Sequence, residues 1–164
     1  ANSVNRSPAY RKKSDTSTNL EVRDLRLQLT DSHTTLIGRL SNLQELTIVS
    51  CHSITNMPEE IGYLNKLENL QIECCDSLTA IPSSIGRLSN LQELTIRSCR
   101  SITNMPEEIG NLNKLEELEI ECCDSLTAIP PSIGHLSNLH ELTIKLFPSI
   151  YNILHLLRYR NNFI

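Results

Sequence analysis

The chain is 164 residues long, enough for one domain, with 39% hydrophobic residues and a formal net charge of −4. Only 4% of the residues are aromatic and tryptophan is absent, which favours small aliphatic core layers over a large aromatic core. No apolar run approaches the roughly 18–20 residues of a membrane span, so we expect no membrane partner.

Residues 1–19 are rich in Ser, Asn and Thr and contain the basic cluster Arg11, Lys12 and Lys13. They predict a disordered basic tail, or alternatively a nuclear-import or acidic-partner segment. This tail carries four basic side chains against one acidic one, so the rest of the chain is net −7 and should repel nucleic acids. Because no apolar signal segment opens the sequence, an intact chain should be cytoplasmic, or nuclear if the cluster is an import signal; a longer chain could carry a signal upstream.

Residues 20–36 predict an irregular N-terminal repeat or cap, in which Val22–Leu27 (VRDLRL) forms a strand. A regular 24-residue unit then occupies residues 37–145 and follows the pattern L-x-x-L-x-x-L-x-I-x-x-C-x-S-[IL]-T-x-[MI]-P-x-x-I-G. A fixed period of this length is typical of a leucine-rich-repeat solenoid. Such a stack offers a long open surface rather than an enclosed pocket, so binding is its default role.

Each regular unit predicts one strand and one return arm. The expected strands are 43–48, 67–72, 91–96, 115–120 and 139–144, because their apolar residues alternate with polar ones. A proline in each arm (Pro58 and its equivalents) cannot continue a ladder and favours a 3₁₀-like return, and the glycine after it (Gly62 and its equivalents) is expected at a chain turn. The predicted fold is an α/β solenoid with a curved parallel sheet on the concave side and irregular or 3₁₀ segments on the convex side.

Residues 146–164 lose the pattern. Ile150, Ile153, Leu154 and Leu157 fall at helical spacing, which predicts a degenerate repeat and a short amphipathic C-terminal cap. The alternative is an uncovered apolar flank through which chains could associate.

Six cysteines follow the repeat. Cys51, Cys75, Cys99 and Cys123 lie 24 residues apart, and Cys74 and Cys122 are additional. We interpret them as buried thiols, because a straight column of sulfur atoms does not make a tetrahedral metal site. Neither a metal nor a cofactor is expected.

The segment Leu67–Gly86 (LENLQIECCDSLTAIPSSIG) and its copies resemble the leucine-rich repeats of plant intracellular nucleotide-binding disease-resistance receptors. The resemblance covers residues 37–145. It implies a protein-sensing role in plant defence. The phosphate-binding loop G-x-x-x-x-G-K-[ST] of those receptors does not occur in this sequence. The resemblance therefore implies at most the sensing or autoinhibitory part of such a receptor, or a stand-alone relative.

Outward strand residues predict three columns on the concave face, and we expect a protein partner to contact them. The first is Glu45, Asn69, Glu93, Glu117 and Glu141; the second is Thr47, Gln71, Thr95, Glu119 and Thr143; the third is Val49, Glu73, Arg97, Glu121 and Lys145. The alternative is an ordinary solvated sheet face.

The two halves of the repeat array differ at positions that help to distinguish a binding surface from an ordinary solvated face. Residues 41–88 and 89–136 are identical at 41 of 48 positions, and three of the seven differences fall in the columns: Val49/Arg97, Asn69/Glu117 and Gln71/Glu119. No inward Leu or Ile differs, as expected if truncating a core side chain costs about 2–5 kcal/mol. Surface drift after a recent duplication would give a similar pattern.

Catalytic interpretations are weaker. Cys51 and His52 are adjacent but should point in opposite directions, and His135 and His140 match no metal spacing. The paired carboxylates, such as Glu59 and Glu60, lie on the convex arm without a cleft. We therefore expect a non-catalytic protein-recognition module. The alternatives are a structural or engineered repeat scaffold without a partner, and a secreted plant enzyme-inhibitor-type repeat.

Overall fold

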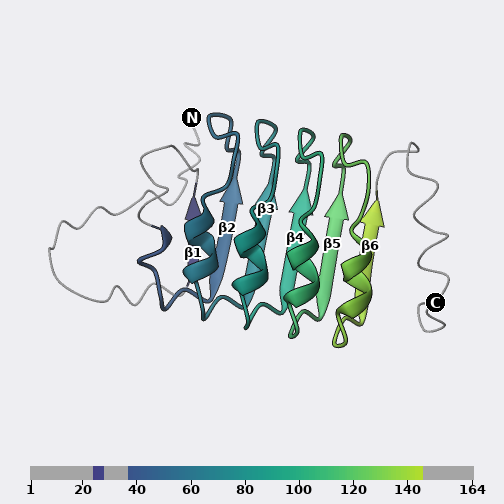
Figure 1. Ribbon diagram of the computed structural model, residues 1–164. Helices are drawn as coiled ribbons and strands as arrows, with labels where there is room; N and C mark the ends of the chain where they lie inside the picture. Colours follow the sequence, from purple (N-terminus) through teal and green to yellow (C-terminus); the bar gives the residue numbers. More distant parts are fainter. Residues whose placement is uncertain (1–23, 28–36, 146–164) are drawn as a thin grey trace, which may run out of the picture.

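The computed structural model describes residues 24–27 and 37–145. Six parallel strands form one open sheet in the order β1 to β6, and four 3₁₀ helices stack on one side of it (Figure 1). The strands are β1 Asp24–Leu27, β2 Glu45–Val49, β3 Asn69–Glu73, β4 Glu93–Arg97, β5 Glu117–Glu121 and β6 Glu141–Lys145. The helices are η1 Glu59–Tyr63, η2 Ser83–Arg87, η3 Glu107–Asn111 and η4 Pro131–His135. The predicted solenoid class is confirmed.

The strand register follows the 24-residue period from β2 to β6. Leu46 pairs with Leu70 and Ile48 with Ile72, and the same alignment continues to the last strand. β1 joins the sheet at the predicted irregular repeat, with Leu25 opposite Leu46. The predicted tail at residues 1–19 and the predicted cap at residues 146–164 lie outside the described residues.

The regular strands begin two residues later than predicted. The amide of Leu43 donates to the carbonyl of Leu40 at 2.9 Å, and that of Leu67 to Leu64 at 3.0 Å. These bonds close the turn that leads into each strand, so the first Leu of the predicted strand belongs to the turn and not to the ladder.

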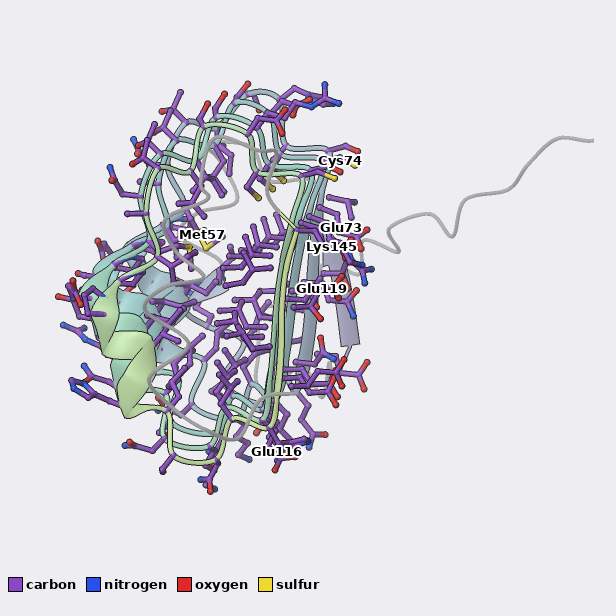
Figure 2. The ribbon with its side chains drawn as sticks, turned by 90° about the vertical axis from the view of Figure 1, so that its right-hand side faces the viewer. Met57, Glu73, Cys74, Glu116, Glu119 and Lys145 are labelled. Carbon is purple, nitrogen blue, oxygen red and sulfur yellow. The ribbon has the colours of Figure 1, made fainter. Side chains whose placement is uncertain are left out.

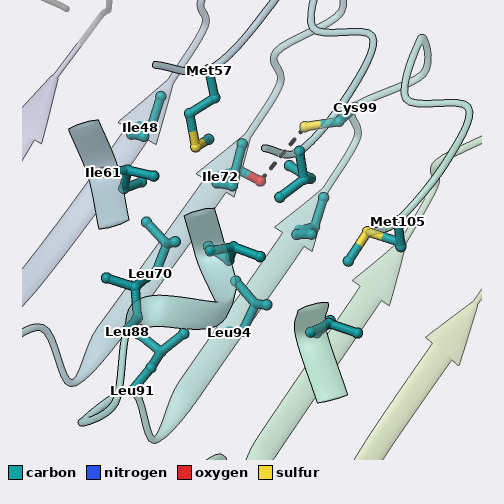
Figure 3. Packing of buried hydrophobic residues seen from close by; sticks show 14 of the residues in the cluster. Ile48, Met57, Ile61, Leu70, Ile72, Leu88, Leu91, Leu94, Cys99 and Met105 are labelled. Atoms are coloured by element: carbon teal, nitrogen blue, oxygen red, sulfur yellow. Dashed lines mark hydrogen bonds between the residues drawn. The ribbon is translucent and has the colours of Figure 1, made fainter. Parts of the chain in front are cut away.

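The core lies between the sheet and the 3₁₀ helices (Figure 3). Inward strand residues such as Leu70 and Ile72 are fully buried, and so is Ile85 of η2. Leu142 and Ile144 in the last described strand are only half-buried. Each rung buries its apolar residues against its neighbours, which explains why the inward positions of the two 48-residue halves are identical.

The proline-containing arms form 3₁₀ helices, as predicted. Each helix begins directly after a proline in an extended conformation, for example Pro58 with φ −66° and ψ 141°. The predicted role of the glycines in a chain turn is wrong, because they lie inside these helices and none has a positive φ. A Cβ atom on Gly62 would lie 2.7 Å from the carbonyl oxygen of Ser84, so close stacking of rungs, and not turn geometry, requires glycine there.

The left-handed turn lies elsewhere, directly after each strand. Ser50, Cys74, Ser98 and Cys122 have φ between 51° and 54°. The amide of Cys74 donates to the carbonyl of Arg97 at 3.0 Å, which extends the backbone ladder by one bond beyond the strand. This turn directs the chain away from the sheet and into the return arm.

Candidate functional site

The outward strand residues form three straight columns, as the sequence predicts. The register places Glu45, Asn69, Glu93, Glu117 and Glu141 side by side at the amino ends of the strands. We call these five residues the amino-side column. The middle column is Thr47, Gln71, Thr95, Glu119 and Thr143, and the carboxyl-side column is Val49, Glu73, Arg97, Glu121 and Lys145. A role of these residues in partner binding stays a prediction.

The columns lie on the face of the sheet that points away from the 3₁₀ helices, which we call the sheet face. In Figure 2 the labelled side chains of Glu73, Glu119 and Lys145 project from this face, whereas Met57 points into the interior. The alternating burial of the strands agrees: Leu94 and Ile96 are buried, and Thr95 between them is partly exposed. No described element packs over the sheet face.

Arg97 is the centre of an ion-pair network in the carboxyl-side column. Its Nε and Nη2 donate to the two carboxylate oxygens of Glu119 at 2.8 and 2.6 Å. Its Nη1 also lies 3.8 Å from Oε1 of Glu73, and its Nε lies 3.8 Å from Oε2 of Glu121. The hydrogen-bonded carboxylate of Glu119 raises the pKa of Arg97 further, so this cation is permanent.

Lys145 extends the same network by one strand. Its Nζ pairs with Glu121, and this hydrogen bond lowers the pKa of the Glu121 carboxyl and raises the pKa of Lys145. Three carboxylates therefore share two cations within this group. We call Glu73, Arg97, Glu119, Glu121 and Lys145 the ion-pair network.

The bidentate contact of the network crosses between columns. Arg97 is aligned with Glu73 and Glu121 in the sheet, yet its bidentate partner is Glu119 in the middle column of the next strand. A guanidinium fork matches a carboxylate in this geometry, and such paired bonds are stronger than a single contact. In the first copy of the 48-residue unit, Val49 and Gln71 occupy the equivalent positions, so only the second copy can make this pair.

The glutamates of the amino-side column have no such neighbouring cations within residues 37–145. Within residues 37–145, no Lys or Arg side chain forms an ion pair with Glu45, Glu93, Glu117 or Glu141. Burial raises the pKa of the Glu93 carboxyl, and the neighbouring charges of Glu117, Glu45 and Glu116 raise it further. The side-chain amide of Asn69 in β3 donates a hydrogen bond to the carboxylate of Glu93 in β4.

Two further acidic residues border this column and were not among the predicted partner-binding residues. Glu68 and Glu116 directly precede β3 and β5, and Glu116 lies at the lower edge of the sheet in Figure 2. Gln44 donates to Glu68 at 3.3 Å. Their 48-residue spacing was visible in the sequence, but they fall outside the two-residue alternation used to find the columns.

The cysteine prediction is confirmed for one column and wrong for the two additional residues. Cys51, Cys75, Cys99 and Cys123 are buried, whereas Cys74 and Cys122 are exposed. The cause is the left-handed turn, which places the first residue of each Cys-Cys pair outside and the second inside. The Cys99 thiol lies 3.7 Å from the carbonyl oxygen of Ile72 in the neighbouring strand (Figure 3).

Two of the buried thiols, those of Cys75 and Cys123, are poor nucleophiles. The pKa of Cys75 is raised to about 11: the Cys51 thiol lowers it, but the Cys99 thiol and burial together raise it by more. Burial also raises the pKa of Cys123. Because the thiolate is the reactive form, these shifts suit a packing role.

In the described part of the chain, the residues considered for catalysis or metal binding are not brought together in a site. Cys51 is buried while His52 is exposed, so the two side chains face opposite directions, as expected from the sequence. Within residues 24–27 and 37–145, no group of three or more His, Cys, Asp or Glu side chains has an arrangement that could hold a metal ion. In the same part of the chain no helix has the length and apolarity that a bilayer crossing needs.

Comparison with known protein families identifies the family of the chain. Residues 15–156 match the model of a leucine-rich repeat region. No curated protein matches the chain.

Similar solved structures include plant receptor ectodomains. One is the leucine-rich-repeat ectodomain of the membrane receptor kinase GASSHO1/SCHENGEN3 from Arabidopsis thaliana, in complex with CASPARIAN STRIP INTEGRITY FACTOR 2 (28% identity, TM-score 0.44). The alignment covers 69% of this chain and 17% of that one. Another is the ectodomain of the receptor kinase SOBIR1 from Arabidopsis thaliana (23% identity, TM-score 0.43), with 68% of this chain and 62% of that one covered. The chain thus spans less than two thirds of either ectodomain. On the family match over most of its length, the chain belongs to the leucine-rich-repeat family.

Proposed function

We propose that this chain recognises a protein partner through its sheet face and that it does so without catalysis. The observation that carries the proposal is the sheet face itself: three aligned columns of outward side chains, all polar except Val49, stand on one parallel sheet, and no described element covers them. Repeat solenoids use such extended surfaces to bind other proteins. Because the columns are fixed by the backbone register, binding would need little reordering of the strands.

We further propose a role in plant defence, as the sensing or autoinhibitory part of an immune receptor or as a stand-alone relative. This rests on the motif resemblance of segments such as Leu67–Gly86 to plant intracellular immune receptors. A cytoplasmic location is part of the proposal. The buried thiol column fits a reducing compartment, because its packing needs no disulfide.

A blocking substitution tests the recognition proposal. Thr95 lies at the centre of the middle column and is partly exposed. Thr95→Arg would place a long side chain over the middle of the sheet face without removing a core contact. Partner proteins captured from plant lysate by the full chain should be lost with this variant.

Thr127→Arg is the matched control, because Thr127 is exposed on the return arm away from the sheet. Both variants should keep the circular dichroism spectrum of the parent chain. If Thr95→Arg captures the same partner with unchanged affinity, the sheet face is not the recognition surface and the proposal fails.

A repeat scaffold without a partner of its own is the second candidate, and one observation favours it. The two 48-residue halves are identical at 41 positions, as in a recently duplicated or engineered array. A scaffold should yield no saturable partner under any capture condition. Saturable capture that is abolished by Thr95→Arg would exclude it.

A further inference from the structure

The turns that lead into the strands collect basic side chains and exclude acidic ones. Residues 37–145 contain seven Lys and Arg, and the ion pairs within this range use only Arg97, Arg100 and Lys145. None of the fifteen Asp and Glu of the same range lies in these turns, at 39–42, 63–66, 87–90, 111–114 and 135–138. The four cations without an ion pair inside the range all do: Arg39, Lys66, Arg87 and Lys114.

The two lysines of these turns are held by neutral groups. Lys66 donates through Nζ to Oδ1 of Asn42 at 2.8 Å, and Lys114 donates to Oδ1 of Asn90 at 2.7 Å. The side-chain amide of Asn90 in turn donates to the carbonyl oxygen of Asn65 at 2.5 Å, which ties neighbouring turns together. These amides orient the ammonium groups without neutralising them, so their charge stays available to an anion.

An exposed aromatic side chain lies in the same turns. Tyr63, the last residue of η1, is 55% exposed, and among the described residues it is the one large hydrophobic side chain that is exposed. Its ring packs on the preceding rung, where a Cβ atom added to Gly38 would lie 3.2 Å from Cδ2. Arg87, the last residue of η2, occupies the equivalent position on the next rung.

This combination of residue types points to a protein ligand. Tyr and Arg are enriched among the residues that carry most of the binding energy in protein interfaces. In the other half of the array, Tyr63 and Arg87 are replaced by Asn111 and His135, two of the seven differences between the halves. The backbone therefore does not require the aromatic ring or the guanidinium at these positions.

We propose that Tyr63, Lys66, Arg87 and Lys114, which we call the turn row, bind a short acidic segment of a protein partner. Carboxylates of the segment would pair with the three cations, and Tyr63 would contact the chain beside them. The turn row lies outside the three columns of the sheet face, so this inference goes beyond the proposed function and does not depend on it.

The spacing of the rungs limits the length of the segment. Neighbouring strands lie about 4.8 Å apart, so Lys66 and Lys114, two rungs apart, are separated by about 9.6 Å along the stack. An extended chain covers this distance with about three residues. A long polyanion such as a nucleic acid would run beyond the turn row, over a body in which acidic side chains outnumber basic ones by fifteen to seven. A short acidic peptide meets only the cations.

An NMR titration tests where such a segment binds. The probe is a peptide of three glutamates blocked at both ends, added to the isotope-labelled full chain at about 0.05 M ionic strength, where screening is weak. We expect amide shifts to change at Tyr63, Lys66, Arg87 and Lys114. Changes confined to the sheet face, or to the basic cluster at residues 11–13, would overturn the inference.

Substitutions taken from the other half of the array test the residues. Arg87→His and Tyr63→Asn introduce side chains that the equivalent positions already carry, so both variants should keep the circular dichroism spectrum of the parent chain. Histidine is largely neutral at about pH 7.5. Each substitution should weaken peptide binding about threefold, because the first removes a cation and the second an aromatic contact.

Arg100→His is the matched control. It makes the same exchange at a position whose equivalent is His52, and Arg100 follows β4 at the opposite end of the strand from the turn row. Arg100 already pairs with Asp124 at 3.7 Å, so its loss should leave the affinity for the peptide unchanged.

Equal effects of Arg87→His and Arg100→His would reduce the turn row to a share of the overall charge and reject the inference. Tighter binding of an oligothymidylate of similar length to the same residues would reject the acidic protein segment in favour of a nucleic acid. Neither result bears on the sheet face, because the proposed function depends on the Thr95→Arg capture experiment.

Discussion

The amino-side and carboxyl-side columns stand on the same strands, four residues apart, and both are rich in glutamate. In the carboxyl-side column, Arg97 and Lys145 alternate with Glu73 and Glu121, so neighbouring charges attract. In the amino-side column, glutamates face one another along the register, and the pKa of Glu93 is raised. The same backbone therefore supports one edge that contributes to stability and one edge that opposes it.

The largest expected effect is that of Arg97→Glu. It would place a fourth carboxylate among Glu73, Glu119 and Glu121 and give this edge the character of the other. Because Arg97 is 46% exposed, solvent screens the loss. We expect the free energy of unfolding, measured in urea, to fall by about 1–2 kcal/mol.

Arg97→Val is the control for this change, since valine is the residue at the equivalent Val49. It removes the cation without adding a charge and should cost less than Arg97→Glu. Equal stability of the parent and Arg97→Glu would mean that the network does not distinguish the two edges.

Neutralising one glutamate at each edge should have opposite effects. Glu93→Gln removes a repelled charge and should raise the unfolding midpoint; at this exposed position we expect the free energy of unfolding to rise by about a few tenths of a kcal/mol. Glu121→Gln removes a partner of Lys145 and should lower the midpoint. Shifts of the same sign in thermal unfolding at pH 7 would contradict the contrast between the columns.

The pH dependence should separate the same two residues. The pKa of Glu93 is raised above 4.5, so the folded chain binds this proton more tightly and stability should rise as the pH falls towards 4.5. The pKa of Glu121 is lowered below 4.5, so its contribution is present above 4.5 and is lost as the pH falls further. The midpoint of urea unfolding, measured from about pH 7 to about pH 3, should pass through a maximum.

Glu93→Gln should remove the rise on the neutral side of this maximum, and Glu121→Gln should reduce the fall on the acid side. A profile that falls steadily from neutral pH in the parent chain would show that repulsion in the amino-side column is negligible.

The smallest expected effect is that of salt. Raising the ionic strength from about 0.05 M to 0.5 M shortens the screening length and weakens both attraction and repulsion. The unfolding midpoint of Arg97→Val should therefore rise with salt more than that of the parent chain, because repulsion dominates once the cation is gone. If the unfolding midpoints of Arg97→Val and of the parent chain change equally with salt concentration, Arg97 does not offset repulsion among the carboxylates of the network.

Much of this arrangement could be predicted from the sequence, because a 24-residue period determines the register of every strand. Once Leu46 and Leu70 are aligned, the polar residues between them must form columns, and the structure confirms all three. The proline positions likewise predict the start of each 3₁₀ helix. These features follow from backbone geometry that each repeat copies.

Features that depend on contacts between rungs were harder to predict. The bidentate pair of Arg97 and Glu119 runs diagonally, and the register alone would select Glu73 or Glu121. The requirement for glycine at position 62 comes from the backbone of Ser84 in the next rung. The exposure of Cys74 comes from a left-handed turn at a residue type that rarely adopts it.

The most direct test of the account is a residue-resolved map of where the partner captured from plant lysate contacts the chain. Amide chemical shifts of the isotope-labelled chain should be followed during titration with that partner. We expect the largest changes in β2 to β6 around Thr95, with little change in η1 to η4. Changes centred on the 3₁₀ helices would contradict the claim that the sheet face is the recognition surface.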